Sequence, residues 1–275
     1  MNQRERAAHF RQLHTQPPLI LPNAWDAASA RVIEQAGAPA IATTSAGISW
    51  VYGLGDGQKL QRDEMTHMIR CIVESVDVPV TADIEGGYGT GSPQDVADTV
   101  QAVLDAGVCG INLEDTPGRD GETLLAPEAQ AERIRAAREA AQAAGADLFL
   151  NARIDVYLFQ VGAPETRFAE TVRRANLYRA AGADCLFVPG VIDAETIAAL
   201  VRDIDGPVNI MAMPGAPSIP ELARLGVARV SLGPAIIQAA LATTQQAARE
   251  LLEHGTYRTL ENSLPFSETN RLFRR

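Results

Sequence analysis

The sequence predicts a (β/α)₈ barrel in which residues 1–275 form a single domain. Three observations lead to this fold class: short β-like runs alternate with longer amphipathic stretches, the runs number eight, and a glycine precedes five of them by a few residues. Alternation of this kind over about 250 residues is typical of a closed parallel barrel, because each helix returns the chain to the start of the next strand. A doubly wound open sheet is the alternative, but no G-x-G-x-x-G follows the first run.

The elements are expected in the following order. An extra helix at about residues 2–14 precedes the first strand. The strands are expected at residues 19–24, 40–45, 78–85, 110–115, 148–155, 185–190, 208–213 and 229–233. The stretches between them carry apolar residues at helical spacing, and the glycines at Gly37, Gly107, Gly145, Gly182 and Gly226 suit the left-handed position that ends a helix. A helical segment follows residue 234, and it either packs on its own barrel or is exchanged between subunits.

Composition and charge exclude several classes of function. The chain has 34 acidic and 24 basic residues, a net charge of −10, and no basic run, which argues against nucleic acid and anionic membranes as partners. Three cysteines without paired spacing argue against a disulfide framework or a zinc cluster. Lys59 is the only lysine and its setting is typical of a solvated helix start, so Schiff-base chemistry is disfavoured. The N-terminus has no signal-peptide pattern, and we expect a cytoplasmic protein.

Carboxylates gather where the predicted strands end, which is the catalytic mouth of such barrels. Asp83 and Glu85 are two residues apart, so the strand period directs both to one face, and either Glu114 or Asp115 reaches the same level. On the next strand Asn151, Arg153 and Asp155 share a face. A divalent cation with oxygen ligands would neutralise such a cluster, and Mg²⁺ is favoured over zinc because no His or Cys is at hand. The alternative is a salt-bridge network around Arg153 that closes the top of the barrel.

The loops after the strands supply further candidates. The run TTSAGIS offers Thr44, Ser45 and the backbone around Gly47 to a carboxylate or an enolate oxygen, although an ordinary turn would have the same sequence. Residues 116–125 carry two glycines among polar residues and are a candidate lid. The histidines and cysteines fall in helical stretches or at strand beginnings, away from this mouth: His9, His14, His67, His254, Cys71, Cys109 and Cys185.

At TSAGISWVYGLGDG, TADIEGGYG, INLED and NARID the sequence resembles the isocitrate lyase and phosphoenolpyruvate mutase superfamily, over about residues 18–235. The resemblance implies an Mg²⁺-dependent enzyme, with Mn²⁺ as an alternative, that acts on 2-oxo or 2-hydroxy carboxylates through an enolate-type intermediate. It implies the following roles: Asp83 as direct metal ligand, Glu85 and Glu114 as further metal-holding acids, Asp56 as an acid near the metal, Arg153 on the substrate carboxylate or oxyanion, and Thr44 or Ser45 with Gly47 as the substrate-binding turn. We also expect Asp83 and Asn151 to face the substrate.

The departures from the superfamily concern the substrate more than the fold. Isocitrate and methylisocitrate lyases carry a Lys-Cys-Gly-His signature where this chain reads TPGRDGETLL, so Asp120 and Glu122 are the remaining conventional proton donors of that loop, and Glu122 is our candidate. We expect a lyase that cleaves a C–C bond of a small 2-oxo or 2-hydroxy carboxylic acid. The alternatives are P–C chemistry on phosphonopyruvate, as mutase or hydrolase, and a non-catalytic barrel that binds a 2-oxo dicarboxylate. The expected assembly is a homo-oligomer, a dimer or a tetramer.

Overall fold

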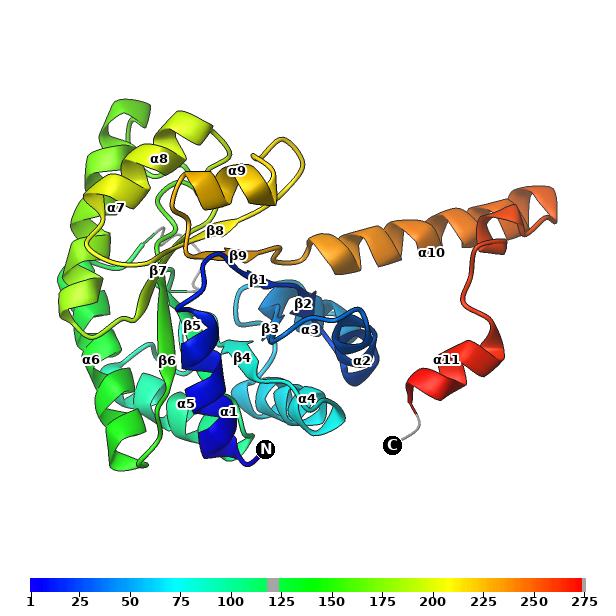
Figure 1. Ribbon diagram of the computed structural model, residues 1–275, viewed down its shortest axis with the longest axis horizontal. Coiled ribbons are helices and arrows are strands. Elements are labelled where there is room, and N and C mark those ends of the chain that lie inside the picture. Colours follow the sequence, from blue (N-terminus) through cyan, green and yellow to red (C-terminus); the bar gives the residue numbers. More distant parts are fainter. Residues whose placement is uncertain (118–123, 274–275) are drawn as a thin grey trace.

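The computed structural model describes residues 1–117 and 124–273, and it confirms the predicted α/β barrel (Figure 1). All strand pairings are parallel, and the order in the sheet is β1-β9-β8-β7-β6-β5-β4-β3-β2. The strands are β1 (Leu19–Leu21), β2 (Asn23–Ala24), β3 (Ile41–Thr43), β4 (Val80–Asp83), β5 (Gly110–Glu114), β6 (Phe149–Arg153), β7 (Cys185–Val188), β8 (Val208–Met211) and β9 (Arg229–Ser231).

The predicted first strand, residues 19–24, is divided into two short strands by Pro22. Proline has no backbone N–H to donate to a ladder, whereas its carbonyl oxygen accepts a bond of 3.2 Å from the N–H of Ala42. On one side of Pro22, β1 pairs with β9, and on the other side β2 pairs with β3. The two ends of the strand order are therefore neighbours along the chain, and the sheet is nearly closed.

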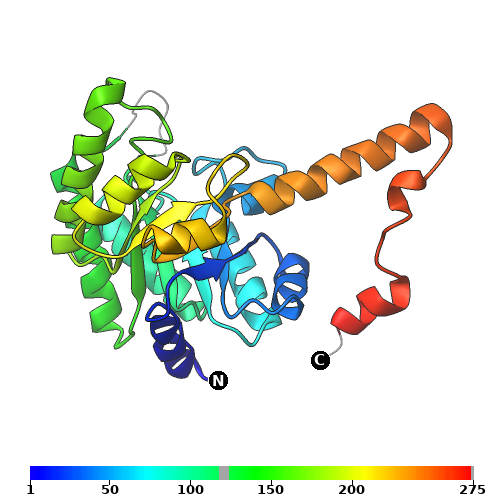
Figure 2. The same cartoon turned by 45° about the horizontal axis from the view of Figure 1, so that its top comes forward.

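Most of the helices surround the barrel and connect its strands, and the last ones project from it (Figures 1 and 2). They are α1 (Gln3–Leu13), α2 (Ala27–Gln35), α3 (Ser45–Val51), α4 (Arg62–Ser75), α5 (Pro93–Asp105), α6 (Pro127–Ala143), α7 (Pro164–Ala180), α8 (Ala194–Asp203), α9 (Ile219–Arg224), α10 (Ala235–His254), the 3₁₀ turn η1 (Arg258–Leu260) and α11 (Phe266–Leu272). The predicted extra N-terminal helix is α1. Among these helices, none combines the length and the apolar character that crossing a membrane would need in the described part of the chain.

Two apolar layers stabilise the barrel, one between strands and helices and one inside its N-terminal end. The inner layer is closed by α1, whose Phe10 packs edge-to-face on Phe149 with ring centroids 5.6 Å apart. His14 stacks on the same Phe149 ring at 3.8 Å. This end is filled by hydrocarbon and aromatic groups, so the chemistry is left to the opposite mouth.

The strands that carry the candidate acids end earlier than the sequence pattern predicts. β4 ends at Asp83 and β6 ends at Arg153, so Glu85 and Asp155 lie just beyond their strands. β3 ends at Thr43, and Ser45 already begins α3. These chain segments turn at the mouth, and the side chains beyond each strand end are placed by turns instead of by strand alternation.

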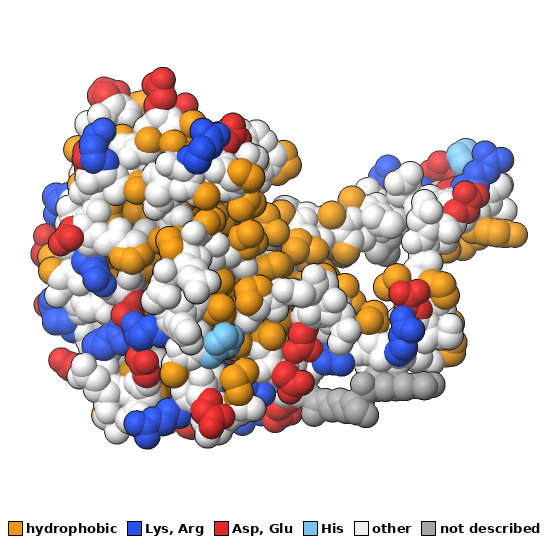
Figure 3. All heavy atoms as spheres, viewed as in Figure 1, with side chains coloured by type: hydrophobic (Ala, Val, Ile, Leu, Met, Phe, Trp, Pro, Cys, Tyr) orange, Lys and Arg blue, Asp and Glu red, His pale blue; other side chains and the backbone are white. Residues whose placement is uncertain are grey.

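The C-terminal part of the chain projects from the barrel as a long arm (Figures 1 and 2). Ile237 is the buried residue of α10, whereas Leu252 is 85% exposed and Phe266, at the start of α11, is 82% exposed. Figure 3 shows apolar side chains gathered where the arm leaves the barrel. The chain then turns back, and the Arg31 guanidinium of α2 donates bonds of 3.0 and 2.9 Å to the carbonyl of Leu272.

Candidate active site at the barrel mouth

Asp83 is the last residue of β4 and lies at the mouth beside the first turn of α3. Its Oδ2 accepts bonds from the Ser45 hydroxyl (2.9 Å) and from the Ser45 backbone N–H (3.2 Å). Thr43 Oγ1 accepts the backbone N–H of Asp83 at 2.9 Å, which fixes the end of β4 against β3. Ser45, the first residue of α3, therefore holds this carboxylate with both its side chain and its backbone.

Glu85 occupies a turn just after β4, with the left-handed backbone angle φ of 49°. Its carboxylate accepts the backbone N–H of Gln58 and the hydroxyl of Tyr88, the latter at 3.2 Å. The side chain is 1% exposed, and burial, with the nearby charges of Asp56 and Asp83, raises the pKa of Glu85 to about 8. Burial and the neighbouring carboxylates thus favour the protonated form of this carboxyl.

Glu114 and Arg153 form an ion pair across adjacent strands of the mouth. Glu114 Oε2 lies 2.7 Å from Arg153 Nη1, and the two residues are register partners of β5 and β6. Burial raises the pKa of Glu114 well above its usual value despite the opposing effect of Arg153. The sequence left Glu114 and Asp115 as alternatives for this position, and the structure places Glu114 against Arg153 and Asp115 against Arg174 of α7.

Asp155 forms a second ion pair with the Arg153 guanidinium. Arg153 Nε lies 2.7 Å from Asp155 Oδ1, and Asp155 is completely buried. Burial alone would lower the pKa of Arg153, but the carboxylates of Asp155 and Glu114 raise it well above its ordinary value. Arg153 is thus held by two carboxylates, and these ion pairs are the salt-bridge network that the sequence left as the alternative.

Asp56 lies on the loop between α3 and α4. The residue as a whole is exposed, yet its carboxyl is turned toward the acids of the mouth. Loss of water around the carboxyl, together with the charge of Asp83, raises the pKa of Asp56, and bonds from Gly57 and Ser45 oppose this rise. The structure therefore brings Asp56 into the electrostatic field of Asp83 and Glu85.

Thr44, Ser45 and Gly47 form the buried start of α3. The Thr44 hydroxyl caps the helix by accepting the N–H of Gly47 at 3.4 Å, so of the three Ser45 is the one bonded to a mouth carboxylate. Gly47 is packed too closely for any side chain: an added Cβ would lie 2.7 Å from Thr44 Cγ2 and 2.9 Å from Trp25 Cβ.

Asn151 lies inside the barrel, one inward position below Arg153, and is fully buried. Its Nδ2 donates to Asn112 Oδ1 (2.8 Å) and Asn209 Oδ1 (3.0 Å), and Arg229 Nη2 donates to the same Asn112 oxygen (3.1 Å). These residues form a polar layer beneath the carboxylates. Sequence reasoning missed Asn112, Asn209 and Arg229, although a polar residue at an inward position of an otherwise apolar strand was a readable signal.

Two further residues that sequence reasoning missed hold Glu85. Gln58 and Tyr88 bond its carboxylate and also line a cavity of about 480 Å³ beside the mouth, together with Pro117 and Arg62. Gln58 comes from 27 positions away along the chain, and no local pattern marks it. Asp120 and Glu122 of the candidate lid lie outside the described residues.

The donor set at the mouth fits a hydrated divalent cation. Asp83, Glu85 and Glu114 offer carboxylate oxygens, and burial, with the neighbouring carboxylates, raises the pKa values of Glu85 and Glu114. Within residues 1–117 and 124–273, no three His, Cys, Asp or Glu side chains are arranged as a ready-made metal shell. Because a divalent cation with oxygen ligands takes about six of them, these three carboxylates would leave the remaining positions to water.

Comparisons with known proteins agree with this fold. The family model described as phosphoenolpyruvate phosphomutase matches residues 10–252. A Burkholderia cenocepacia J2315 protein with a provisional lyase/mutase assignment has a solved structure that matches with TM-score 0.92 and 40% identity, over 99% of this chain and 97% of that one. The structure of 2,3-dimethylmalate lyase, a PEP mutase/isocitrate lyase superfamily member, matches with TM-score 0.84 and 29% identity, over 97% and 94% of the two chains. An uncharacterized protein of Mycobacterium tuberculosis (strain CDC 1551 / Oshkosh) is 36% identical over 94% of this chain and 93% of its own.

Proposed function

Because this chain belongs to the phosphoenolpyruvate phosphomutase family, within the isocitrate lyase and phosphoenolpyruvate mutase superfamily, we propose that it is a cytoplasmic, Mg²⁺-dependent lyase. Its proposed reaction cleaves a C–C bond of a small 2-oxo or 2-hydroxy carboxylic acid through an enolate-type intermediate. One observation carries the proposal: Arg153 is held between Glu114 and Asp155 at the same mouth as Asp83 and Glu85. Positive charge for a substrate carboxylate and oxygen ligands for a cation thus lie side by side.

Each residue at the mouth has a proposed task. Asp83 would hold the cation directly, and Glu85 and Glu114 would hold it through water. When bound, Mg²⁺ or Mn²⁺ supplies charge stabilisation for the developing enolate oxygen. The planar guanidinium of Arg153 suits a substrate carboxylate, because its N–H groups can donate two parallel bonds. Ser45, at the start of α3, holds Asp83 in place.

Four other groups complete the proposed site. Asp56, with its raised pKa, can hold a proton at the edge of the mouth. Asn151 supports the floor of the site, and the backbone around Thr44 and Gly47 orients the start of α3. Glu122 remains the proposed proton donor to the enolate. We expect Glu122→Gln to slow formation of the protonated product and to leave Mg²⁺ binding unchanged, and normal turnover of this variant would place the donor elsewhere.

The decisive experiment replaces Asp83 by alanine. Asp83→Ala should abolish Mg²⁺-dependent turnover and Mg²⁺ binding measured by calorimetry, while the metal-free protein keeps its fold because one buried carboxylate has been removed. Asp205→Ala, on the exposed segment before β8, is the control and should bind Mg²⁺ like the parent. Unchanged Mg²⁺ affinity in Asp83→Ala would remove this residue from the metal site.

P–C chemistry on phosphonopyruvate is the second candidate, because the matching family model is that of a phosphomutase. A panel of 2-oxo acids, 2-hydroxy acids and phosphonopyruvate, tested for turnover with and without Mg²⁺, separates the two reactions. A member of the panel that raises the melting temperature in Mg²⁺ without being consumed would favour a non-catalytic binding barrel.

We also propose a homo-oligomer, a dimer or a tetramer, in which the C-terminal arm packs on another copy. The supporting observation is that α10 buries Ile237 and exposes Leu241, Leu251 and Leu252, an apolar surface that one barrel does not cover. Light scattering of the full chain and of a variant with Leu252→Glu would test this, since a charged residue in the interface should shift the protein toward monomer.

A further inference from the structure

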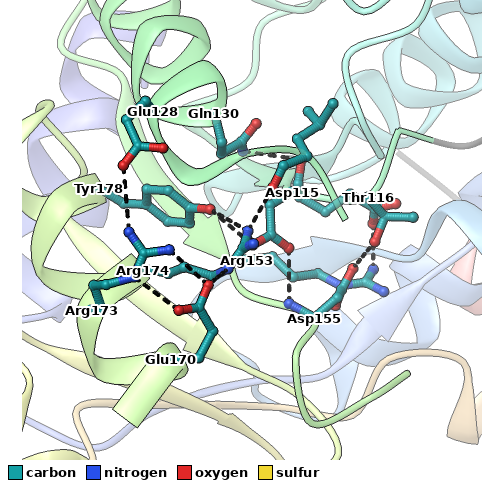
Figure 4. Close-up of polar contacts among 12 residues, drawn as sticks. Asp115, Thr116, Glu128, Gln130, Arg153, Asp155, Glu170, Arg173, Arg174 and Tyr178 are labelled. Atoms are coloured by element: carbon teal, nitrogen blue, oxygen red, sulfur yellow. Dashed lines mark hydrogen bonds and ion pairs between the residues drawn. The ribbon is translucent and has the colours of Figure 1, made fainter. Parts of the chain in front are cut away.

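Behind Arg153 lies a buried polar network that the proposed reaction does not itself require (Figure 4). The carboxylate of Asp155 pairs with Arg153 Nε and also accepts a hydrogen bond of 2.7 Å from the Thr116 hydroxyl. The backbone N–H of Asp155 donates to Asp115 Oδ1 at 3.0 Å. Asp115 is completely buried and points away from the mouth. The network therefore continues from the active site into the layer between barrel and helices.

Asp115 forms hydrogen bonds with the backbone on both sides of Ile154, the residue that follows Arg153. Its backbone N–H donates to the Arg153 carbonyl at 3.2 Å, and its carboxylate accepts the N–H of Asp155. The peptide segment from Arg153 to Asp155 is thus held at both ends by one residue of the neighbouring strand. Because a guanidinium can form its two ion pairs only in a narrow range of orientations, fixing this segment also fixes where Arg153 points.

The second carboxylate oxygen of Asp115 bonds two side chains of α7. Asp115 Oδ2 accepts Arg174 Nη1 and the Tyr178 hydroxyl, each at 2.9 Å. Arg174 also donates to the Leu125 carbonyl at 2.9 Å, and the Leu125 N–H donates to the carbonyl of Asp115 at 2.9 Å. At its outer end Arg174 pairs with Glu170 at 2.7 Å. A fully satisfied buried network of this kind holds its members in one geometry, whereas removing a member leaves charges unpaired.

We propose that Asp115, anchored by Arg174 and Tyr178, is a positioning residue that sets the orientation of Arg153 toward the substrate through Asp155. The inference rests on the proposed function, in which Arg153 binds the substrate carboxylate. It assigns a role in substrate affinity to residues that do not reach the mouth.

The first test is Asp115→Asn, with oxalate in Mg²⁺ as the probe, because oxalate carries the two coplanar carboxylates of a small enolate-like anion. An asparagine keeps the size but presents an amide N–H₂ to a neighbouring donor, either the Asp155 N–H or Arg174. We expect oxalate affinity, measured by calorimetry, to fall at least tenfold while affinity for Mg²⁺ alone changes less than twofold. Glu170→Gln is the matched control, since it weakens the ion pairs of Glu170 with Arg174 and Arg173 and leaves the contacts of Asp115 in place. Its oxalate affinity should stay within twofold of the parent. Parent-like oxalate binding in folded Asp115→Asn would overturn the proposal.

A double-mutant cycle separates positioning from a general structural effect. In the Arg153→Lys background the guanidinium that Asp115 positions is absent, so adding Asp115→Asn should weaken oxalate binding less than twofold. Full tenfold losses from each substitution, multiplied in the double variant, would show that Asp115 acts independently of Arg153 and would overturn the proposal.

Two further measurements keep the test decisive. If the parent does not bind oxalate, the proposed function fails for this anion, and the position of Arg153 is followed instead through hydrogen exchange of its Nε–H by NMR. That exchange should quicken at least tenfold in Asp115→Asn, and an unchanged rate would overturn the proposal. If Asp115→Asn does not fold, Tyr178→Phe removes one of the two donors to Oδ2; a twofold to fivefold loss of oxalate affinity supports the proposal, and parent-like binding refutes it.

Discussion

Replacing Glu85 by glutamine should stabilise the metal-free protein in alkaline solution. Glu85 is 1% exposed and accepts two hydrogen bonds, yet burial and the charges of Asp56 and Asp83 raise its pKa from 4.5 to about 8. A group whose pKa is higher in the folded state stabilises that state fully below its unfolded pKa, and this stabilisation is lost as the pH rises. The free energy of unfolding should therefore fall between about pH 4.5 and pH 8 in the parent.

The magnitude follows from the rise in pKa. At about 1.4 kcal/mol per pH unit, a rise from 4.5 to about 8 gives a ceiling of about 5 kcal/mol for the stability lost across this range. Relaxation of the site and titration of neighbouring acids reduce this ceiling, and we expect a loss of at least about 2 kcal/mol. Glu85→Gln carries no titrating proton at this position and should lose that much less stability than the parent.

The assay is urea unfolding in a chelator at pH 5 and at pH 8.5, for the parent and for Glu85→Gln. Glu139→Gln, on the exposed face of α6, is the control and should follow the parent at both pH values. Equal pH dependence in the parent and in Glu85→Gln would refute the reasoning. With Mg²⁺ added at pH 8.5 the parent should regain stability, because a bound cation favours the ionised carboxylate.

Three other predictions test parts of the molecule separately. Burial lowers the pKa of His14 from 6.5 to about 4, so the parent should lose up to about 3 kcal/mol of stability as the pH falls from 6.5 to 4. The variant His14→Phe keeps the stack on Phe149 and should lose less stability over this range, as measured by urea unfolding at the two pH values. Gly47→Ala should destabilise the protein by about 1–3 kcal/mol in thermal unfolding, since its Cβ would lie 2.7 Å from Thr44 Cγ2 and this overpacking exceeds the gain in helix propensity. A melting temperature at or above that of the parent would contradict this. Arg153→Lys should weaken substrate binding in steady-state kinetics although the charge is kept, because lysine cannot donate the paired bonds of a guanidinium, and parent-like kinetics would make the arginine structural.

The fold and much of the candidate site could be predicted because they depend on local patterns. Short β-like runs that alternate with helical stretches indicated the barrel, and strand ends indicated where Asp83, Arg153 and one of Glu114 and Asp115 would meet. The sequence also indicated that the histidines and cysteines lie away from the strand ends. In each case the information lies within a few residues, where backbone geometry dictates which way a side chain points.

Other features were decided only by the tertiary structure. Pro22 divides the first strand, and only the pairing of its two halves with β9 and β3 shows how the barrel closes. Glu85 shares its strand pattern with Asp83, but a turn and the distant Gln58 set its environment and therefore its pKa. Which of Glu114 and Asp115 faces the mouth depended on where β5 ends.

Asp115 shows the physical reason for this division most clearly. Its partners Arg174 and Tyr178 lie about sixty positions later in the sequence, and nothing near Asp115 specifies them. A charged residue can be buried only where opposite charges and hydrogen-bond donors converge on it, and that convergence comes from the packing of whole elements. The sequence by itself therefore determined the barrel and the residues at its mouth, whereas the partners that hold those residues in place were determined by the contacts between strands and helices.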